Sequence, residues 1–324
     1  MGEFDLIERY FKRPARRVAL GVGDDCALLQ PAPGMQLAIS SDMLLEGRHF
    51  LSTVDPRKLG HKALAVNLSD LAACGAKPLA FTLALALPRV DEAWLAAFSD
   101  GLLALADAHD CELIGGDTTQ GPLNICITIF GEVPVLEGKS QALLRSGAKP
   151  GDDLYVSGTL GDARLALEVF RGTLSVPAPV FELARSRMEQ PTPRVALGLA
   201  LRGIASAAID ISDGLLGDLG HILAQSGVGA TVQADAASAL VASRVDCDRI
   251  SLAQWRSLAL AGGDDYELLF SAPASARSQV MQAAASSQTK VTRIGAIEEA
   301  SGLRLVDSEG SELPNRYSSF DHFA

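Results

Sequence analysis

Short apolar runs alternate with longer amphipathic segments along the first 140 residues of the chain. The apolar run at 37–40 predicts a strand. The Asp55-Pro56 pair predicts the start of a helix, because Asp is favoured as an N-cap and Pro at the first helical position, and Gly75 predicts its end. Residues 79–87 form an unbroken apolar run, which is typical of a strand covered on both faces. A second helix and two more strands are expected at 91–109, 112–115 and 123–133.

A stretch rich in Gly, Lys and Ser at 137–153 precedes a second series of strands and helices. The expected strands lie at 154–157, 207–211 and 267–270. The expected helices lie at 162–171, 192–202, 214–226 and 275–287, the third of them closed by Gly227. The pattern predicts an α/β protein of two domains, residues 1–140 and residues 150–324, joined near 138–152.

The composition limits where such a protein can act and what it can bind. Over 324 residues, 28 Lys and Arg stand against 39 Asp and Glu, which gives a net charge of −11. This balance argues against nucleic acid and anionic membranes as partners, since both attract basic surfaces. No apolar run reaches the ~18 residues of a membrane span, and the charged N-terminus lacks a secretory segment. The five cysteines have no paired spacing, so we expect a cytoplasmic protein whose cysteines serve packing.

Aspartates recur directly after apolar runs that end in Gly or Ser. Five such turns carry them, at Asp24-Asp25, Asp42, Asp117, Asp210 with Asp213, and Asp264-Asp265. Asp70 lies within the helix predicted from Asp55 onward, on the face opposite much of its apolar stripe. Because these turns are short, we expect their aspartates at strand ends, where α/β folds place their ligands.

Carboxylates gathered at one site repel one another and need a cation to be stable together. Mg²⁺ is the expected cation, because it prefers carboxylates and keeps water and substrate phosphates in its shell. A polyphosphate substrate bound through Mg²⁺ therefore suits an acidic site in an acidic protein. The chain has no P-loop, protein-kinase, nucleophile-elbow, C-x-x-C or H-E-x-x-H motif.

Each of these residues also has an ordinary structural interpretation. Asp213 could be a simple N-cap, Asp264-Asp265 a solvated turn and Asp70 a solvent-facing helix residue. His49 could be a packed histidine and Arg145 a linker charge. The coincidence of five similar turns favours a shared site over five separate structural roles.

Seven segments, in order along nearly the whole chain, resemble motifs of the thiamine-monophosphate kinase family. They are residues 21–29, 40–50, 67–73, 113–119, 145–151, 209–214 and 262–268. The resemblance implies the aminoimidazole ribonucleotide synthetase-like fold of two α/β domains. In that fold the N-terminal domain binds metal and nucleotide, and its mixed sheet pairs into a β-barrel across a homodimer. The C-terminal domain is an α/β sandwich that completes the active site.

The resemblance also implies a reaction and roles for individual residues. The reaction transfers the γ-phosphoryl group of ATP to thiamine monophosphate and gives thiamine diphosphate and ADP, with several Mg²⁺ ions. The implied magnesium ligands, some through main-chain oxygen or water, are Asp25, Ser40, Ser41, Asp42, Asp70, Asp117, Asp210 and Asp213. The implied nucleotide contacts are Gly116, Asp117, Arg145 and Ser212. The implied substrate contacts are His49, Asp264 and Phe320.

Two positions depart from the family pattern. Ser41 stands where the family often has Thr, which keeps the hydroxyl. Asp264 stands where Glu is common, so its carboxylate has a shorter reach.

No catalytic base is expected for this reaction. The acceptor is a phosphate monoester that is mostly dianionic at pH 7, because its second pKa is about 6. In-line transfer then requires only that the repulsion between ATP and the acceptor phosphate be reduced. Bound Mg²⁺ and Arg145 would reduce it.

Two alternatives stay open at this point. One is a sister enzyme of the same superfamily that acts on a purine intermediate or makes selenophosphate. The latter would want a reactive cysteine, and Cys26 comes nearest but follows two aspartates that would blunt its reactivity. The other is a non-catalytic acidic protein that binds a divalent metal.

Overall fold

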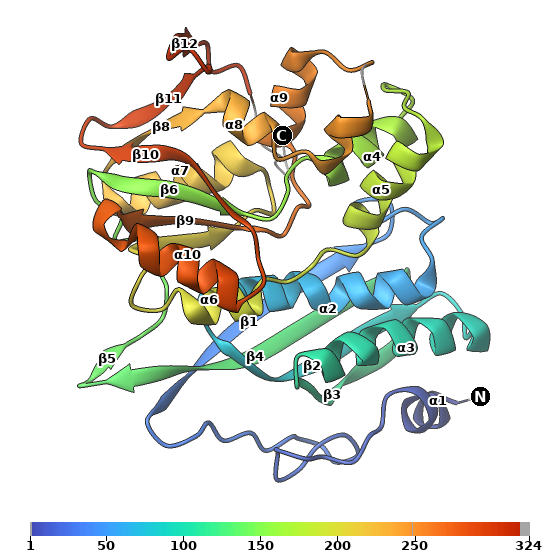
Figure 1. The fold of residues 1–324 in the computed structure, drawn as a ribbon. Helices are drawn as coiled ribbons and strands as arrows, with labels where there is room; N and C mark the ends of the chain where they lie inside the picture. The colour runs from blue at the N-terminus through green and yellow to red at the C-terminus, as the bar shows by residue number, and fades with distance from the viewer. Residues whose placement is uncertain (1, 248, 318–324) are drawn as a thin grey trace. The chain divides into compact units, whose positions relative to one another are not determined.

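A computed structural model describes residues 2–247 and 249–317. The chain divides into two compact units, Met1–Leu71 with Ala76–Gln141, and Ala72–Gly75 with Ala142–Ala324. We call them the N-terminal unit and the C-terminal unit. Both are built from a mixed sheet and helices, as Figure 1 shows, so the predicted class of two α/β domains is confirmed. In the described part of the chain, no helix combines the length and the hydropathy that crossing a membrane requires.

The N-terminal unit is a mixed sheet with helices on one side. Its sheet order is β1-β4-β2-β3, in which β2 and β3 are parallel and the other neighbours antiparallel, while the short β5 pairs with β4. The strands are β1 (Met35–Leu45), β2 (Lys77–Leu87), β3 (Glu112–Gln120), β4 (Asn124–Leu136) and β5 (Lys139–Ser140). The helices are α1 (Glu3–Tyr10), α2 (Pro56–Ala73) and α3 (Glu92–Ala108).

Local signals set both long helices of this unit. The Asp55 carboxylate accepts a hydrogen bond from the main-chain N–H of Arg57 at 2.9 Å, at the start of α2. The Asp91 carboxylate accepts from the N–H groups of Ala93 and Trp94, both at 3.1 Å, and caps α3. The predicted starts of both helices are therefore confirmed.

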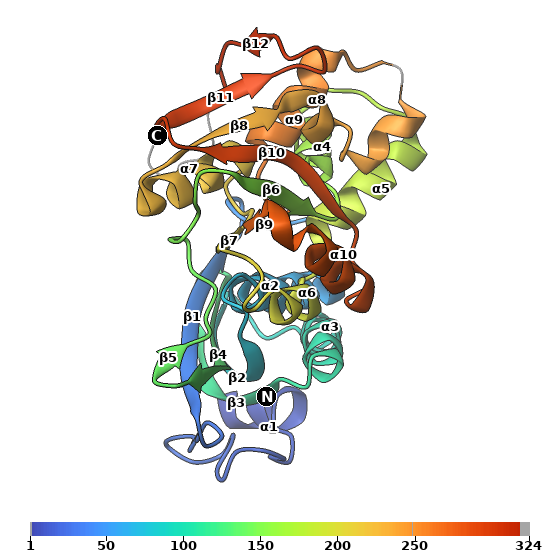
Figure 2. The same cartoon turned by 60° about the vertical axis from the view of Figure 1, so that its left-hand side comes forward.

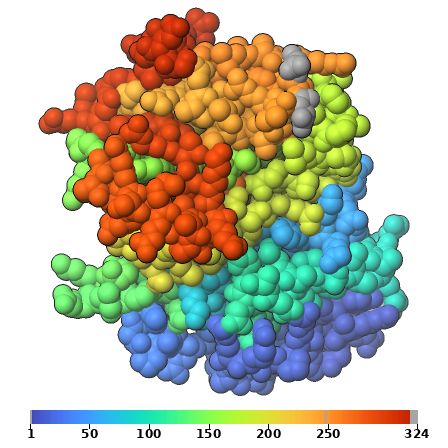
Figure 3. Space-filling view, in the orientation of Figure 1, coloured from blue at the N-terminus to red at the C-terminus, as the bar shows by residue number. Residues whose placement is uncertain are grey.

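Ion pairs connect α1 and the residues just after it to α3. Arg9, in the last turn of α1, pairs with Glu92 at 2.8 Å. Arg13, which follows the helix, pairs with Asp107 at 2.9 Å. Figure 3 shows the dark blue N-terminal segment against the teal α3 on this face. Sequence patterns did not predict α1, whose buried side chains are Leu6 and Tyr10.

The expectation that residues 79–87 are covered on both faces is wrong. Phe81, Leu83 and Leu85 are buried on the side of α2 and α3, which lie on the same side of the strands in Figure 2. On the other side, Ala84 is exposed and Thr82 half-buried. Only the start of that second face is covered, where Val18 packs against Leu79, Ala80 and Ile114. The continuous apolar run reflects small residues on the open face, not a second layer of helices.

The C-terminal unit has a seven-stranded sheet in the order β12-β11-β8-β10-β6-β9-β7. Its strands are β6 (Asp152–Ser157), β7 (Ala207–Asp210), β8 (Gly229–Gln233), β9 (Leu268–Pro273), β10 (Val291–Glu298), β11 (Gly302–Val306) and β12 (Glu312–Leu313). Among the strand pairs that the structure describes in this sheet, β8 and β11 are the ones that run parallel. Its α-helices are α4 (Asp162–Phe170), α5 (Ala178–Glu189), α6 (Val195–Ala200), α7 (Leu215–Ser226), α8 (Ala234–Ser238), α9 (Leu252–Ala261) and α10 (Arg277–Ser286).

The predictions for this unit were mixed. The helix expected at 214–226 is confirmed, and Gly227 ends it in the left-handed conformation at φ 67°. The helix expected at 192–202 was too long, because α6 has 6 residues. Pro193 restricts the residue before it to extended backbone, which explains the late start. The helices α5, α8 and α9 and the strands β8, β10, β11 and β12 were not predicted.

One apolar core holds the C-terminal unit together. Leu154 and Val156 of β6 pack with Ile209 of β7, Leu219 of α7 and Leu258 of α9, and all five are at most 4% exposed. This packing fixes the ends of β7 and β9, which lead into the two Asp-rich turns. The core therefore determines where those turns lie.

We predict that the contact between α2 and α3 tolerates no methyl group. A Cβ on Gly101 would lie 1.8 Å from the main-chain oxygen of Arg57, and one on Gly60 would lie 2.1 Å from that of Phe98. Gly101→Ala should destabilise the protein by roughly 1–3 kcal/mol through overpacking, measured as the shift in urea midpoint. Gly220→Ala on α7 is the control, because nothing lies within 4 Å of the new methyl group. It should raise stability slightly, and equal effects of the two changes would contradict the prediction.

Candidate active site

An acidic cluster in the N-terminal unit joins β1 to α2. Ser40 and Asp42 lie two residues apart on β1, so their side chains share one face of the strand. The Ser40 hydroxyl donates a hydrogen bond to the Asp70 carboxylate on α2. Burial and, after it, the negative charge of Asp70 raise the pKa of Asp42 to about 7. Asp70 thus faces the strand and not only solvent, and two carboxylates share one small region.

Ser41 belongs to the opposite face of β1. Its hydroxyl lies 3.0 Å from the hydroxyl of Thr128 on β4 and 3.2 Å from the carbonyl oxygen of Ile127, to which it donates. Side chains alternate along a strand, so its hydroxyl points away from the side of Ser40 and Asp42. This leaves the main-chain oxygen as the group of Ser41 that could serve a metal on that side.

The predicted nucleotide contacts of this unit lie within β3. Gly116 has φ +144°, and a Cβ there would lie 1.8 Å from the carbonyl oxygen of Leu83, so only glycine fits. Asp117 is exposed and stands in register with Ala84 of β2. The expectation that the aspartates mark strand ends is wrong for Asp42 and Asp117, which lie inside β1 and β3. Both are edge strands, where one side of the backbone stays unpaired and polar residues are tolerated.

Asp25 and His49 lie on loops of the same unit. Asp25 is exposed, and its N–H donates to the Asp24 carboxylate at 2.8 Å. The segment 11–34 that carries it lies beside the start of β1 in Figures 1 and 2. His49 follows the end of β1, where its Nδ1 accepts a hydrogen bond from the N–H of Leu45 at 3.0 Å. The neutral imidazole therefore carries its proton on Nε2, which makes that atom a donor.

Two backbone segments of the C-terminal unit are joined by hydrogen bonds. The N–H of Asp264 donates to the Ser212 oxygen, the N–H of Tyr266 to the Ile211 oxygen, and the N–H of Ile211 to the Glu267 oxygen, each at 2.8 Å. A Cβ on Gly263 would lie 2.4 Å from the Ser212 oxygen. The structure thus brings the predicted residues Asp210, Ser212, Asp213 and Asp264 onto adjoining segments.

The second of these segments has a strained backbone. Asp264 and Tyr266 have φ of 70° and 51°, a region that residues other than glycine rarely adopt. Between them, the Asp265 carboxylate accepts from the Gly161 N–H at 2.9 and 3.0 Å and is 4% exposed. Burial raises the pKa of Asp265 well above its usual value. The strained turn is therefore held from beneath by a buried carboxyl group.

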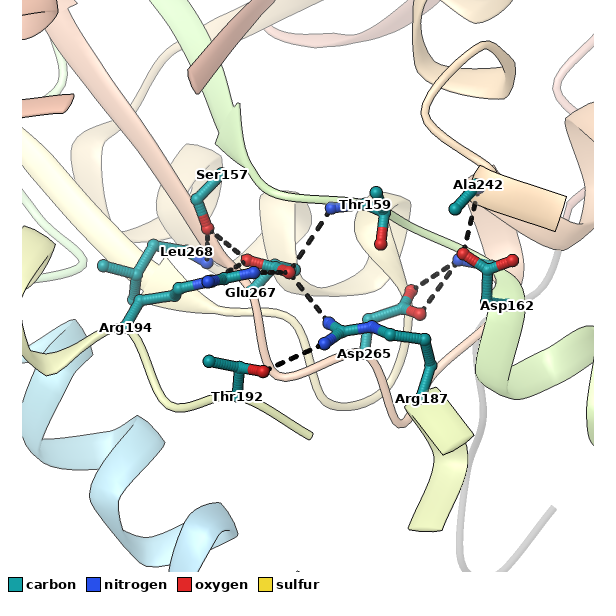
Figure 4. A network of polar contacts seen from close by, with 11 residues as sticks. Ser157, Thr159, Asp162, Arg187, Thr192, Arg194, Ala242, Asp265, Glu267 and Leu268 are labelled. Atoms are coloured by element: carbon teal, nitrogen blue, oxygen red, sulfur yellow. Dashed lines mark hydrogen bonds and ion pairs between the residues drawn. The ribbon is translucent and has the colours of Figure 1, made fainter. Parts of the chain in front are cut away.

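Glu267 is the centre of a buried polar network, drawn in Figure 4. Its carboxylate is fully buried and accepts from Arg194 at 2.6 Å and from Arg187 at 2.9 Å. It also accepts from the Ser157 hydroxyl at 2.6 Å and the Thr159 N–H at 3.3 Å. A buried charge is stable only with such partners. Sequence reasoning missed this residue, although a charged residue beside an apolar strand was a usable signal.

Asp218 on α7 was also missed. One of its carboxylate oxygens accepts from the N–H groups of Ser212, Asp213 and Gly214, all at 3.1 Å. Burial, and then the charge of Asp213, raise the pKa of Asp218 to about 7, although these hydrogen bonds lower it. The N-cap of α7 is Gly214, so Asp213 is not the simple cap that its position allowed.

The remaining predicted residues lie elsewhere. Arg145 is exposed. The residue before it is hydrogen-bonded to β7, because the Ala208 N–H donates to the Leu144 oxygen at 2.8 Å. The main-chain oxygen of Arg145 accepts from the Ser226 hydroxyl at 3.4 Å. Phe320 lies outside the described residues.

A cavity of about 380 Å³ lies beside the Asp264 turn in the C-terminal unit. Its lining includes Arg164, Glu168, Ala261, Arg316 and Tyr317. The Cβ of Arg164 lies 2.8 Å from the position that a Cβ on Gly262 would take, so the cavity borders this turn. A charged and aromatic lining suits a small polar ligand better than an apolar one.

The donor atoms of the N-terminal cluster fit Mg²⁺. Among the described residues, no three His, Cys, Asp or Glu side chains are grouped so as to hold a metal. Mg²⁺ does not require such a cage, because it usually binds one or two carboxylates and completes its shell with water and phosphate oxygens. Asp42 and Asp70 with the Ser40 hydroxyl are hard oxygen donors of this kind.

Both parts of the chain match known protein families. The model of the AIR synthase related protein N-terminal domain matches residues 23–133, and that of the C-terminal domain matches residues 149–308. A thiamine-monophosphate kinase of Salmonella typhimurium is 48% identical over 100% of this chain and 98% of its own length.

Two solved structures are similar to this chain over most of its length. The thiamine-monophosphate kinase of Stenotrophomonas maltophilia K279a has a TM-score of 0.82 and 47% identity, and the match covers 92% of each chain. A structure described as AaThiL complexed with AMPPCP and TMP has a TM-score of 0.76 and 29% identity, with 93% of this chain and 92% of that chain covered.

We predict a pH dependence that belongs to Asp42. A carboxyl group whose pKa rises from 3.8 to about 7 on folding binds its proton more tightly in the folded state. In metal-free protein, its contribution to stability is therefore present at low pH and is lost as the pH rises through 7. Urea midpoints in a chelator should show wild type losing more stability between pH 5 and pH 8 than Asp42→Asn. Identical pH profiles of the two proteins would contradict the pKa assignment.

Proposed function

The chain belongs to the thiamine-monophosphate kinase family of AIR synthase related proteins, and we propose that it transfers the γ-phosphoryl group of ATP to thiamine monophosphate. The products are thiamine diphosphate and ADP. The observation that supports this most directly is the pair of carboxylates of Asp42 and Asp70 beside the Ser40 hydroxyl, which suits a cation that carries phosphate. The similarity to AaThiL complexed with AMPPCP and TMP adds a related fold that binds such ligands.

We assign Mg²⁺ to the acidic residues of the two units. In the N-terminal unit, Asp42 and Asp70 would hold one ion with the Ser40 hydroxyl and the main-chain oxygen of Ser41. Asp117, on the opposite edge strand, and Asp25, on a loop, would hold further ions directly or through water. In the C-terminal unit, Asp210 and Asp213 would do so. When bound, Mg²⁺ neutralises phosphate oxygens and the charge that develops during transfer.

The protein groups have to position two anions and need not move a proton. The acceptor phosphate is mostly dianionic at neutral pH, so no base is required to activate it. The Arg145 guanidinium is exposed and can donate to phosphate oxygens, and Gly116 would contact the nucleotide through its backbone. His49 can donate from Nε2, and Asp264 and Phe320 complete the proposed substrate contacts. We place a polar part of the substrate in the cavity beside the Asp264 turn, whose lining includes Arg164 and Arg316.

We also propose that two copies of the chain pair through the open face of the N-terminal sheet. Ile39 and Met43 of β1 are 60% and 51% exposed on this face, opposite Phe130 and Cys126 of β4. A row of partly exposed apolar and hydroxyl-bearing side chains on a sheet is typical of a surface that a partner covers. A second copy presents a matching face by symmetry, so a homodimer is the simplest occupant. The acidic composition suits a cytoplasmic enzyme without nucleic acid partners.

The enzymatic proposal predicts activity and its loss. Purified protein with ATP, Mg²⁺ and thiamine monophosphate should yield thiamine diphosphate, measured by chromatography. Asp42→Ala and Asp117→Ala should each lower turnover by at least about 10²-fold with little change in thermal stability, because they remove charge stabilisation. Asp100→Ala, which removes an exposed ion pair with Arg57, should keep wild-type activity.

Other outcomes separate the alternatives. Folded wild-type protein that forms no product defeats the proposal, and a panel of purine and selenium substrates would then identify a sister activity. Metal binding without nucleotide binding would favour the non-catalytic alternative. Wild-type turnover in either aspartate variant would remove that residue from the proposed metal ligands.

The dimer proposal makes a separate prediction. Ile39→Arg places a charge on the open sheet face and should convert the dimer to a monomer, measured by sedimentation. Phe4→Arg is the control, because Phe4 on α1 is an apolar residue with 81% exposure that lies off this sheet. A monomeric wild type, or a dimeric Ile39→Arg protein, would contradict the proposed interface.

A further inference from the structure

The start of α7 has a main-chain arrangement that normally binds anions. Three successive N–H groups, those of Ser212, Asp213 and Gly214, converge at the N-terminal end of a 12-residue helix. Such a concave group of donors, together with the helix dipole, is a ready site for a phosphate oxygen. In this protein the site is already filled, because all three donate to the same oxygen of Asp218, which is 3% exposed.

The internal carboxylate changes which ligand this segment can accept. A phosphate group finds no open main-chain donor at 212–214. The neighbouring side chains of Asp210 and Asp213 instead add negative charge next to the filled site. A triphosphate can approach such a segment only when a cation lies between the two.

Asp218 also holds the segment in place from one side, while the Asp264 turn holds it from the other. A Cβ on Gly214, whose φ is +118°, would lie 3.0 Å from the carbonyl carbon of Ala261. The Asp264 N–H donates to the Ser212 oxygen at 2.8 Å. The backbone of Ser212 and Asp213 is therefore fixed between a buried carboxylate and a second backbone segment.

We propose that Asp218 is a positioning residue: it fixes the 212–214 backbone so that Asp213 can bind the cation, and it excludes direct phosphate binding at the helix N-terminus. This inference rests on the proposed function, because it takes Asp210 and Asp213 as the cation-binding residues. Asp218 itself touches neither the cation nor the substrate in this proposal. Its effect comes from the geometry of its accepting oxygen.

Two variants separate geometry from charge. Asp218→Asn keeps an oxygen that can accept from the three N–H groups but loses the charge. Asp218→Glu keeps the charge but is longer by one methylene, so it must displace the segment. Asp162→Asn is the matched control, because Asp162 is 1% exposed and also accepts three hydrogen bonds, from Ala242 and Ser243.

The measurement is calorimetric binding of AMPPCP, a non-hydrolysable ATP analogue, to the full chain over a range of Mg²⁺ concentrations. The Mg²⁺ concentration for half-maximal binding should rise at least about tenfold in Asp218→Glu, as is usual when a group that orients a metal ligand is changed. It should stay within about threefold of wild type in Asp218→Asn and be unchanged in Asp162→Asn. Should the glutamate variant fail to fold, Asp218→Ala takes its place with the same expected rise. In Asp218→Ala, inorganic phosphate should also compete with AMPPCP, because the N–H groups of residues 212–214 have lost the oxygen of Asp218.

Two results would overturn the inference. A wild-type Mg²⁺ requirement in Asp218→Glu means that the position of the segment does not depend on Asp218. A rise in the asparagine variant that equals or exceeds the rise in the glutamate variant means that the loss of charge, and not the position of the segment alone, sets the Mg²⁺ requirement. Wild-type protein that neither forms thiamine diphosphate nor binds AMPPCP contradicts the proposed function itself, which keeps the two failures distinct.

Discussion

Repulsion between carboxylates on neighbouring backbone segments is the constraint on which both units depend. Some of these groups are neutralised inside the protein: Glu267 by two arginines, and Asp218 and Asp265 by main-chain N–H groups and a raised pKa. Others, such as Asp42 beside Asp70, are only half-buried. The fully buried carboxylates hold the Asp-rich turns in place, and the half-buried carboxylates are the ones that we propose as cation ligands. In this proposal carboxylates serve both support and binding, and the degree of burial separates the two roles.

Sequence patterns predicted what depends on neighbours in the chain. The caps at Asp55 and Asp91 and the glycine stop after α7 follow from residues within one helical turn, and they are confirmed. Helix α5 and the partners of Glu267 depend on contacts between residues separated by up to 110 positions, which no local pattern contains. The open face of β2 was missed for a related reason, since an apolar run does not reveal whether a second layer covers it.

The candidate site was predicted in its residue types more than in its geometry. The joining of the 210–213 and 264–267 segments agrees with the idea that separate Asp-rich turns converge. The placement of Asp42 and Asp117 inside edge strands does not agree with the expectation of strand ends. An edge strand serves the same purpose, because it combines a rigid backbone with an unpaired side. Alternation along β1 then explains why Ser40 and Asp42 act together while the Ser41 hydroxyl turns to the other face.

The strained turn gives a physical reason for one departure from the family pattern. Asp264 has φ 70°, in the left-handed region where Asp is several-fold enriched because its short side chain can hydrogen-bond to nearby backbone. A glutamate there would gain reach but would lose this local compatibility. The aspartate therefore combines a carboxylate at the proposed substrate site with a backbone conformation that the turn requires. Because the Asp264 side chain is shorter than that of glutamate, the turn itself has to bring it close to the substrate. The buried side chains of Asp265 and Glu267 set the position of that turn. The proposed contact between the Asp264 carboxylate and the substrate therefore depends on the position of the turn as much as on the length of the Asp264 side chain.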